Sequence, residues 1–192
     1  MDVRRVKLLA IVAAVAFGGL TLIAWTQQWF TLTLTSGQVL TVAGQIAAPA
    51  LSALGLASLA LAAALAIAGA VLRHVLGALE VAIGGLAVSS AVAAVFSPVS
   101  ASTAAVTAAV GESGATAVAA LVSSVSVGMW PYLAVVLGVL SALVGVVVLA
   151  TARRWPNPTR RYETASGETS AQTEADTTVS SWDALSEGRD PT

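Results

Sequence analysis

The sequence predicts an all-α membrane protein: a four-transmembrane-helix bundle with a small extracytoplasmic β-hairpin and a disordered cytoplasmic C-terminal tail. Two observations support this fold class. Hydrophobic residues make up 57% of the 192-residue chain and charged residues only 10%, whereas a typical soluble domain contains about 25% charged residues. The apolar residues are also gathered into four long segments. A soluble domain of this size could not bury so much apolar surface, so we expect the chain to lie in a membrane.

The four apolar segments are long enough to be transmembrane helices. A helix needs about 20 largely apolar residues to cross the ~30 Å hydrocarbon core of a bilayer. Pro49 and Pro131 stand where two of the helices would begin, and proline suits the first helical turn because its missing N–H has no hydrogen bond to lose there. We therefore expect a membrane domain over residues 1–155, with spans at about 8–24, 49–72, 75–96 and 131–150.

The positive residues predict the orientation of these spans. Of the nine Lys and Arg residues, three precede the first span, Arg73 lies between the second and third, and five follow the fourth. The connecting segments 25–45 and 97–130 contain none. Because positive residues are retained on the cytoplasmic side, we expect a multi-pass protein of the plasma membrane with both termini in the cytoplasm.

The first span has a second interpretation as a cleaved signal peptide, because basic residues precede it. The only small-x-small cleavage pattern, Ala14-Val15-Ala16, lies inside the apolar run. Cleavage there would leave too short a hydrophobic region, so we expect an uncleaved helix.

The turn between the second and third spans is expected at Arg73-His74, which would make these helices an antiparallel hairpin. His74 has no His, Cys or Asp beside it in the sequence. We therefore interpret it as a polar turn residue rather than a ligand or a proton carrier.

The segment between the first two spans has the pattern of a β-hairpin. Thr alternates with apolar residues on both sides of Ser36-Gly37, which is the period of a half-buried strand. A lone hairpin is marginally stable in water, so we expect its Phe30, Leu32 and Leu34 face to pack on the helix ends or on the other loop. That loop, 97–130, is rich in Ala, Ser, Thr and Val, and we expect it to form short helices that cover the bundle.

Four tryptophans lie at the expected ends of the spans, and aromatic residues are enriched at membrane surfaces. We predict that they form an aromatic belt there, although Trp25 and Trp29 would also suit a ligand cage. The four are Trp25, Trp29, Trp130 and Trp155.

Glu80 is the one ionisable residue well inside a span, and such a residue is a functional candidate by default. Its expected place near the cytoplasmic end favours a structural role, in which it reaches the membrane surface or pairs with Arg73 or with Lys7 across the bundle. A neutral, protonated Glu80 and a role in coupled transport are the alternatives. No second intramembrane acid or base is available for a proton relay.

Small residues recur every four positions on three of the expected helices, which lets helices approach closely. Such rows predict either a tight bundle or a homo-oligomer. They are Ala60, Ala64 and Ala68; Gly85, Ser89 and Ala93; and Ala134, Gly138 and Ala142.

The residue inventory argues against an enzyme. With no Cys and one His, the chain has no means of forming a disulfide or a thiolate nucleophile, and it lacks the ligands of a zinc site. It also has no phosphate-binding glycine loop and no Ser–His–Asp set. We expect no enzymatic activity, no cofactor and no metal. Four arginines after the last span, Arg153, Arg154, Arg160 and Arg161, are expected to contact anionic lipid head groups rather than nucleic acid.

Residues 156–192 differ in composition from the rest, with three positive and seven negative residues. Such a polar segment is expected to be mostly disordered. A short helix at 181–187 is predicted because Ser180 and Asp183 resemble a capping box. Trp182 and Leu185 would then form a docking motif for a protein partner, and the alternative is a passive chain end.

Short motifs distributed along the chain resemble one known family. The first helix ends in Trp25-x-x-x-Trp29, and Val42-Ala-Gly44 and Pro49 follow. Trp130-Pro131 opens the last helix, Trp155-Pro156 and Arg161-Tyr162-Glu163 come after it, and Trp182-Asp-Ala-Leu185 and Asp190-Pro-Thr192 close the chain. This order resembles the actinobacterial tryptophan-associated transmembrane protein family, whose members are typically encoded among tryptophan-biosynthesis genes. The resemblance implies a four-helix membrane protein and carries over no active site.

Two hypotheses for function follow. The first is a membrane accessory or scaffold protein, which the resemblance links to tryptophan metabolism. The alternative is a small exporter or channel subunit for an aromatic amino acid or precursor, suggested by Glu80 and by the metabolic context of the family.

Overall fold

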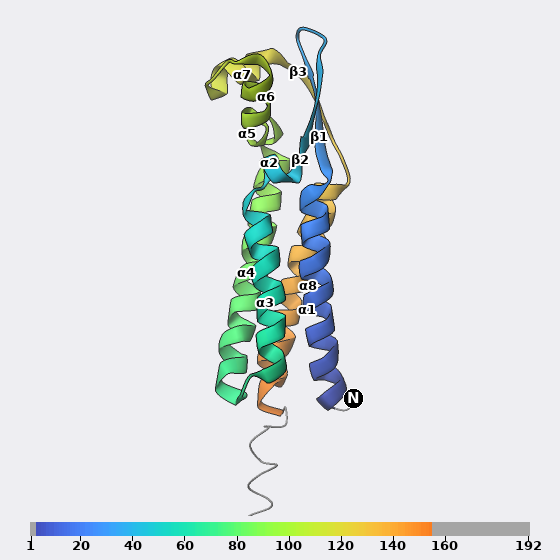
Figure 1. Ribbon diagram of the computed structural model, residues 1–192, viewed down its shortest axis with the longest axis vertical. Helices are drawn as coiled ribbons and strands as arrows, with labels where there is room; N and C mark the ends of the chain where they lie inside the picture. The colour runs from blue at the N-terminus through green and yellow to red at the C-terminus, as the bar shows by residue number, and fades with distance from the viewer. Residues whose placement is uncertain (1–2, 155–192) are drawn as a thin grey trace, which may run out of the picture. The chain divides into compact units, whose positions relative to one another are not determined.

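Four long helices form a bundle in the computed structural model, which describes residues 3–154 (Figure 1). All of these residues belong to the unit Met1–Trp155. The helices are α1 (Val3–Thr26), α3 (Ala50–Ile67), α4 (Ala70–Phe96) and α8 (Trp130–Thr151). Each is long and apolar enough to cross a membrane. The four predicted spans are therefore confirmed as helices. The predicted tail, with its expected helix at 181–187, lies outside the described residues.

The turn between the second and third long helices lies earlier in the chain than predicted. Helix α3 ends at Ile67 and α4 begins at Ala70, so the turn consists of Ala68 and Gly69. The backbone N–H of Arg73 already donates to the carbonyl of Gly69, over 3.1 Å. The prediction of an Arg73-His74 turn is therefore wrong. Polar residues marked the end of an apolar run, but the helix broke at the glycine.

A three-stranded antiparallel sheet stands above one end of the bundle, with the order β2-β1-β3. Strands β1 (Gln28–Leu34) and β2 (Val39–Ala43) form the predicted hairpin, and Gly37 turns the chain with a φ of 84°. The third strand, β3 (Val122–Val127), was not predicted. It comes from the second connecting segment and pairs with the other edge of β1.

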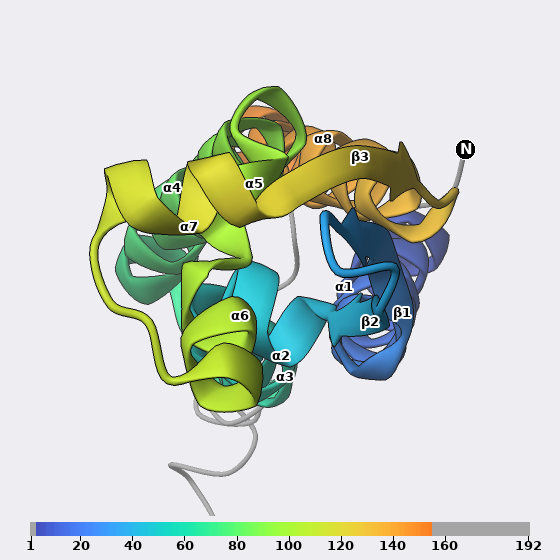
Figure 2. The same ribbon diagram turned by 90° about the horizontal axis from the view of Figure 1, so that it is seen from above.

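Four short helices complete this end of the unit. They are α2 (Gly44–Ala47), α5 (Pro98–Ala101), α6 (Thr103–Val110) and α7 (Ala115–Leu121). Helices α6 and α7 meet at 74° and are together apolar enough to be counted as one broken span. Figure 2, seen from above, shows β1 and β2 over α1 and the short helix α6 over α3. We call residues 27–49 and 97–129 together the cap.

The cap packs around a hydrophobic core that it shares with the adjoining ends of the long helices, including Ala24, Leu51 and Ala91. The predicted inward face of the hairpin is confirmed, because Phe30 and Leu32 are fully buried and Leu34 is 3% exposed. Val106 of α6 and Val118 of α7 are buried in the same cluster. Each large apolar side chain contributes roughly 1.5–3 kcal/mol when it leaves water. This burial stabilises a hairpin that would be marginal alone.

Helices α4 and α8 pack backbone against backbone. A Cβ atom on Gly84 would lie 2.5 Å from the backbone N of Ala142, and one on Gly145 would lie 2.6 Å from the backbone N of Val81. Neither position has room for a side chain. Helices α1 and α3 approach in a similar way at Gly18 and Gly55. Small residues thus permit the close contacts that hold helices together in lipid.

The predicted small-residue rows are only partly inside the bundle. Ala134 and Gly138 of α8 are buried, as expected for a packing row. On α4 the row is not part of the packing within one copy, because Gly85, Ser89 and Ala93 are exposed, and its use in a homo-oligomer stays a prediction. The buried row begins one residue earlier, at Gly84. A shift of one residue turns a side chain by about 100°, and small or apolar residues occur on both faces of the second half of α4, so the sequence there carries little sign of which face packs.

Candidate functional site

Glu80 lies at the centre of the bundle. It is fully buried, on the face of α4 that turns toward α3 and α8. It follows Ala70, the first residue of α4, by about 15 Å along the helix axis. The expected position near the membrane surface is therefore wrong for this side chain, which points into the protein.

Two serines hold one oxygen of the Glu80 carboxyl group. Ser58 Oγ of α3 donates a hydrogen bond to Oε1 over 2.7 Å, and Ser141 Oγ of α8 donates to the same atom over 2.5 Å. The other oxygen, Oε2, is buried and has no hydrogen-bond partner in the described part of the chain. One carboxyl group thus connects three of the four long helices. We call Ser58, Glu80 and Ser141 the polar cluster.

Lys7 and Arg73 make hydrogen bonds elsewhere. Lys7 Nζ donates to the carbonyl of Ala66, and Arg73 Nε donates to the carbonyl of Ala68, each over 2.9 Å. Both carbonyls lie at the C-terminal end of α3, where a cation satisfies unpaired carbonyls and offsets the negative end of the helix dipole. Within residues 3–154, the hydrogen bonds of Glu80 therefore come from two serines and not from the predicted cations.

A small cavity adjoins the polar cluster. Ser58 and Ser141 are among the residues that line it, together with Thr21 of α1. It offers about 10 Å³ to the centre of a water molecule, which is room for about one water.

The chemistry of this site is that of a single carboxyl group. Among the described residues, no group of three His, Cys, Asp or Glu residues lies close enough to hold a metal ion. The carboxyl group accepts hydrogen bonds from both serine hydroxyls through Oε1. Since buried polar atoms are costly when unpaired, Oε2 is the atom of the cluster that a further hydrogen-bond donor would stabilise.

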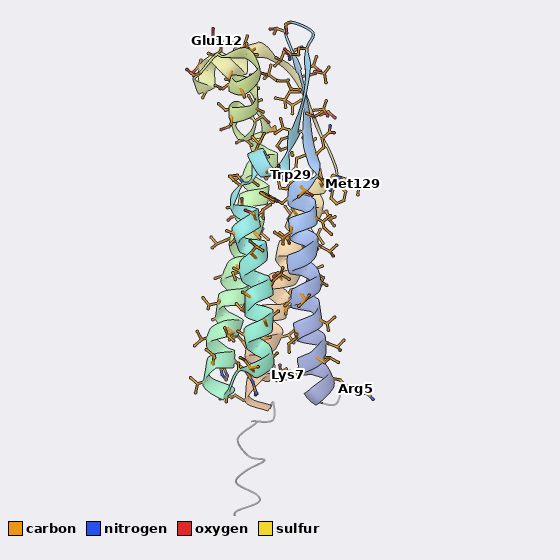
Figure 3. The ribbon with its side chains drawn as sticks, in the orientation of Figure 1. Arg5, Lys7, Trp29, Glu112 and Met129 are labelled. Carbon is orange, nitrogen blue, oxygen red and sulfur yellow. The ribbon has the colours of Figure 1, made fainter. Side chains whose placement is uncertain are left out.

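Trp29 lies where the bundle meets the cap (Figure 3). Its side chain is fully buried, and its Nε1 donates to the carbonyl of Ala24 over 2.8 Å. A Cβ atom on Gly44 would lie 2.6 Å from that nitrogen, so the glycine is needed for the fit. The predicted place in an aromatic belt is therefore wrong for Trp29, which joins α1, β1 and α2.

The other predicted aromatic and docking residues differ in their surroundings. Trp25 and Trp130 are partly buried and pack against the core of the cap. The ring nitrogen of Trp25 is buried and has no partner within residues 3–154. Trp155, Trp182 and Leu185 lie outside the described residues, so their roles stay predictions.

Charge is distributed unevenly along the unit. Figure 3 shows Arg5 and Lys7 at one end of the bundle and Glu112 at the other. Arg73, in the first turns of α4, and Arg153, just after α8, lie at the same end as Lys7. We call this the basic end. The cap contains no Lys or Arg.

The sequence profile of the tryptophan-associated transmembrane protein family matches residues 7–192. The chain belongs to this family. The match covers almost the whole chain and confirms the resemblance seen in its short motifs. No curated protein and no solved structure matches the chain significantly. Membership of the family agrees with the four apolar helices and makes this a multi-pass membrane protein.

Proposed function

We propose that this protein is an accessory or scaffold protein of the plasma membrane, and that its family links it to tryptophan metabolism. The observation that carries the proposal is the closed interior of the bundle. Its central cavity has room for about one water molecule, whereas pockets for small organic ligands are typically about 300–1,000 Å³. Within residues 3–154, this cavity is therefore too small for an amino acid, whereas a folded cap is present at one end.

The contact between α4 and α8 supports a static bundle. Gly84, Gly138 and Gly145 bring the two backbones together along much of their length. Opening a path between these helices would require the loss of that whole contact. A scaffold needs no such motion.

The proposal includes an orientation, with the basic end in the cytoplasm and the cap outside the membrane. The distribution of Lys and Arg supports it. Since the chain has no cysteine, single-cysteine variants report the orientation. Ser36→Cys, in the exposed hairpin turn, should react with an impermeant thiol reagent in intact cells. Gly69→Cys, in the exposed α3–α4 turn, should react only after permeabilisation. The reverse pattern would contradict the orientation.

The partner is proposed to bind the end of the tail. Deletion of residues 180–192, which lie outside the described part of the chain, should abolish co-purification of a partner cross-linked to the full chain. Deletion of residues 165–177, an equally long piece, is the matched control and should leave the partner bound. Equal recovery with both deletions would contradict docking through Trp182 and Leu185.

The polar cluster favours a second candidate function, a small exporter or channel subunit for an aromatic amino acid or precursor. A buried carboxyl group inside a membrane domain is typical of coupled transport, and several copies together would have to enclose the path. Release and uptake of labelled tryptophan should be compared in cells without the protein and in cells restored with wild type or Glu80→Gln. Glu112→Gln, in the exposed cap, is the control. Identical curves in all strains would contradict this candidate.

A further inference from the structure

We propose that an anionic phospholipid binds along the furrow between α1 and α8, with an acyl chain in the furrow and its phosphate near Arg5 and Arg153. The furrow has a volume of about 320 Å³, and every residue that lines it is apolar. It opens on the outside of the bundle, where lipid surrounds a membrane protein. It forms because α1 turns the small side chains of Ala10 and Ala13 toward α8.

The length of the furrow matches one leaflet of a bilayer. On α1 it extends from Val6 to Phe17, which is about 16 Å at 1.5 Å per residue. That is about half of the ~30 Å hydrocarbon core. On α8 the lining residues extend from Leu140 to Val147.

The charge at the open end of the furrow favours an anionic head group. Arg5 directly precedes Val6, and Arg153 follows Val147 by less than two turns of helix. Both arginine side chains are exposed. Guanidinium groups bind phosphate through paired hydrogen bonds. Lys7 already donates to Ala66, and Arg73 is buried, which leaves Arg5 and Arg153 better placed for a head group. The cap end has no Lys or Arg.

The test measures lipid binding to the purified full-length protein by native mass spectrometry in detergent. Phosphatidylglycerol, phosphatidylcholine and glycerol phosphate are titrated separately. We expect phosphatidylglycerol to bind at a concentration at least tenfold lower than phosphatidylcholine, and Arg5→Gln and Arg153→Gln each to reduce this preference about fivefold. Equal affinity for the two lipids would overturn the proposal. Binding of glycerol phosphate as tight as that of phosphatidylglycerol would show a free-phosphate site and would also overturn it.

A substitution that fills the furrow provides a second, independent test. Ala13→Phe should block the furrow and lower phosphatidylglycerol binding. Ala16→Phe is the matched control, because Ala16 is exposed on the same helix and is not among the lining residues. Unchanged lipid binding in Ala13→Phe would contradict the proposal. If Ala13→Phe instead converted a dimer into a monomer without changing lipid binding, the furrow would belong to a second copy of the chain. The two arginine variants alter exposed side chains, so they keep the test valid if Ala13→Phe fails to fold.

Discussion

The cap buries aromatic side chains, whereas the closest helix contacts of the bundle depend on glycine. Trp29, Phe30 and Leu32 are fully buried in the cap. In the bundle the closest contacts are made by glycine, and the buried polar groups include Ser58 and Glu80. In the orientation proposed above, the cap lies in water, where apolar burial stabilises a fold. Lipid removes that advantage, so helices in a membrane depend on close packing and hydrogen bonds.

The largest effect is expected from Trp29→Ala, which removes the ring at the junction of the two regions. It should cost the cap about 3–5 kcal/mol of stability, because it leaves a cavity and removes the hydrogen bond from Trp29 Nε1 to the carbonyl of Ala24, which then keeps only the N–H of Gln27. Hydrogen–deuterium exchange should show faster exchange in β1 and β2 but not in α4. Val39→Ala, at an exposed site, is the control and should change little. Equal loss of protection in the bundle would contradict two separately stabilised regions.

A side chain at Gly84 should disrupt the bundle instead of the cap. Gly84→Leu meets backbone atoms of α8 that have no room to move aside, so we expect a loss of about 3 kcal/mol. The loss is measured by unfolding the protein in a denaturing detergent and monitoring its helix content by circular dichroism. Gly85→Leu is the matched control, since nothing lies within 4 Å of a Cβ atom there. Equal effects of the two variants would mean that α4 does not pack through the Gly84 face.

The polar cluster should contribute less to the free energy of unfolding of the bundle than the glycine contact between α4 and α8. Ser58→Ala and Ser141→Ala each remove one hydrogen bond to Glu80, and we expect each to cost about 1–2 kcal/mol in the same unfolding assay. Ser89→Ala is the control, because Ser89 is exposed and donates to the carbonyl of Leu86 on its own helix. No difference among the three variants would show that the cluster does not stabilise the bundle.

The smallest effect on the free energy of unfolding is expected from the loss of a cation at the C-terminal end of α3. Lys7→Gln removes the cation that donates to the carbonyl of Ala66, which should cost about 0.3–1 kcal/mol. The loss should shrink at high salt, because screening weakens the interaction of a charge with the helix dipole. A salt-independent loss would indicate that Lys7 acts through packing of its aliphatic stem.

The hairpin and the spans were predictable because their signals are local. A span is recognised from the length of one apolar run. A strand is recognised from a period of two, here the alternation of Thr with Phe30, Leu32 and Leu34. The pairing of β3 with β1 had no such signal, since it joins residues far apart along the chain, such as Phe30 and Val127.

By itself, the sequence determined the family, the number of membrane helices and the inward face of the hairpin. Hydrophobic length, period-two alternation and short ordered motifs are all properties of neighbouring residues. Only the tertiary structure decided which face of α4 packs and what surrounds Glu80. Its serine partners are 22 and 61 residues away along the chain, and small residues on both faces of α4 leave its rotation undecided by the sequence pattern. The backbone of α8 packs against Gly84 and not against Gly85. In this rotation of α4, Glu80 lies between the two serines.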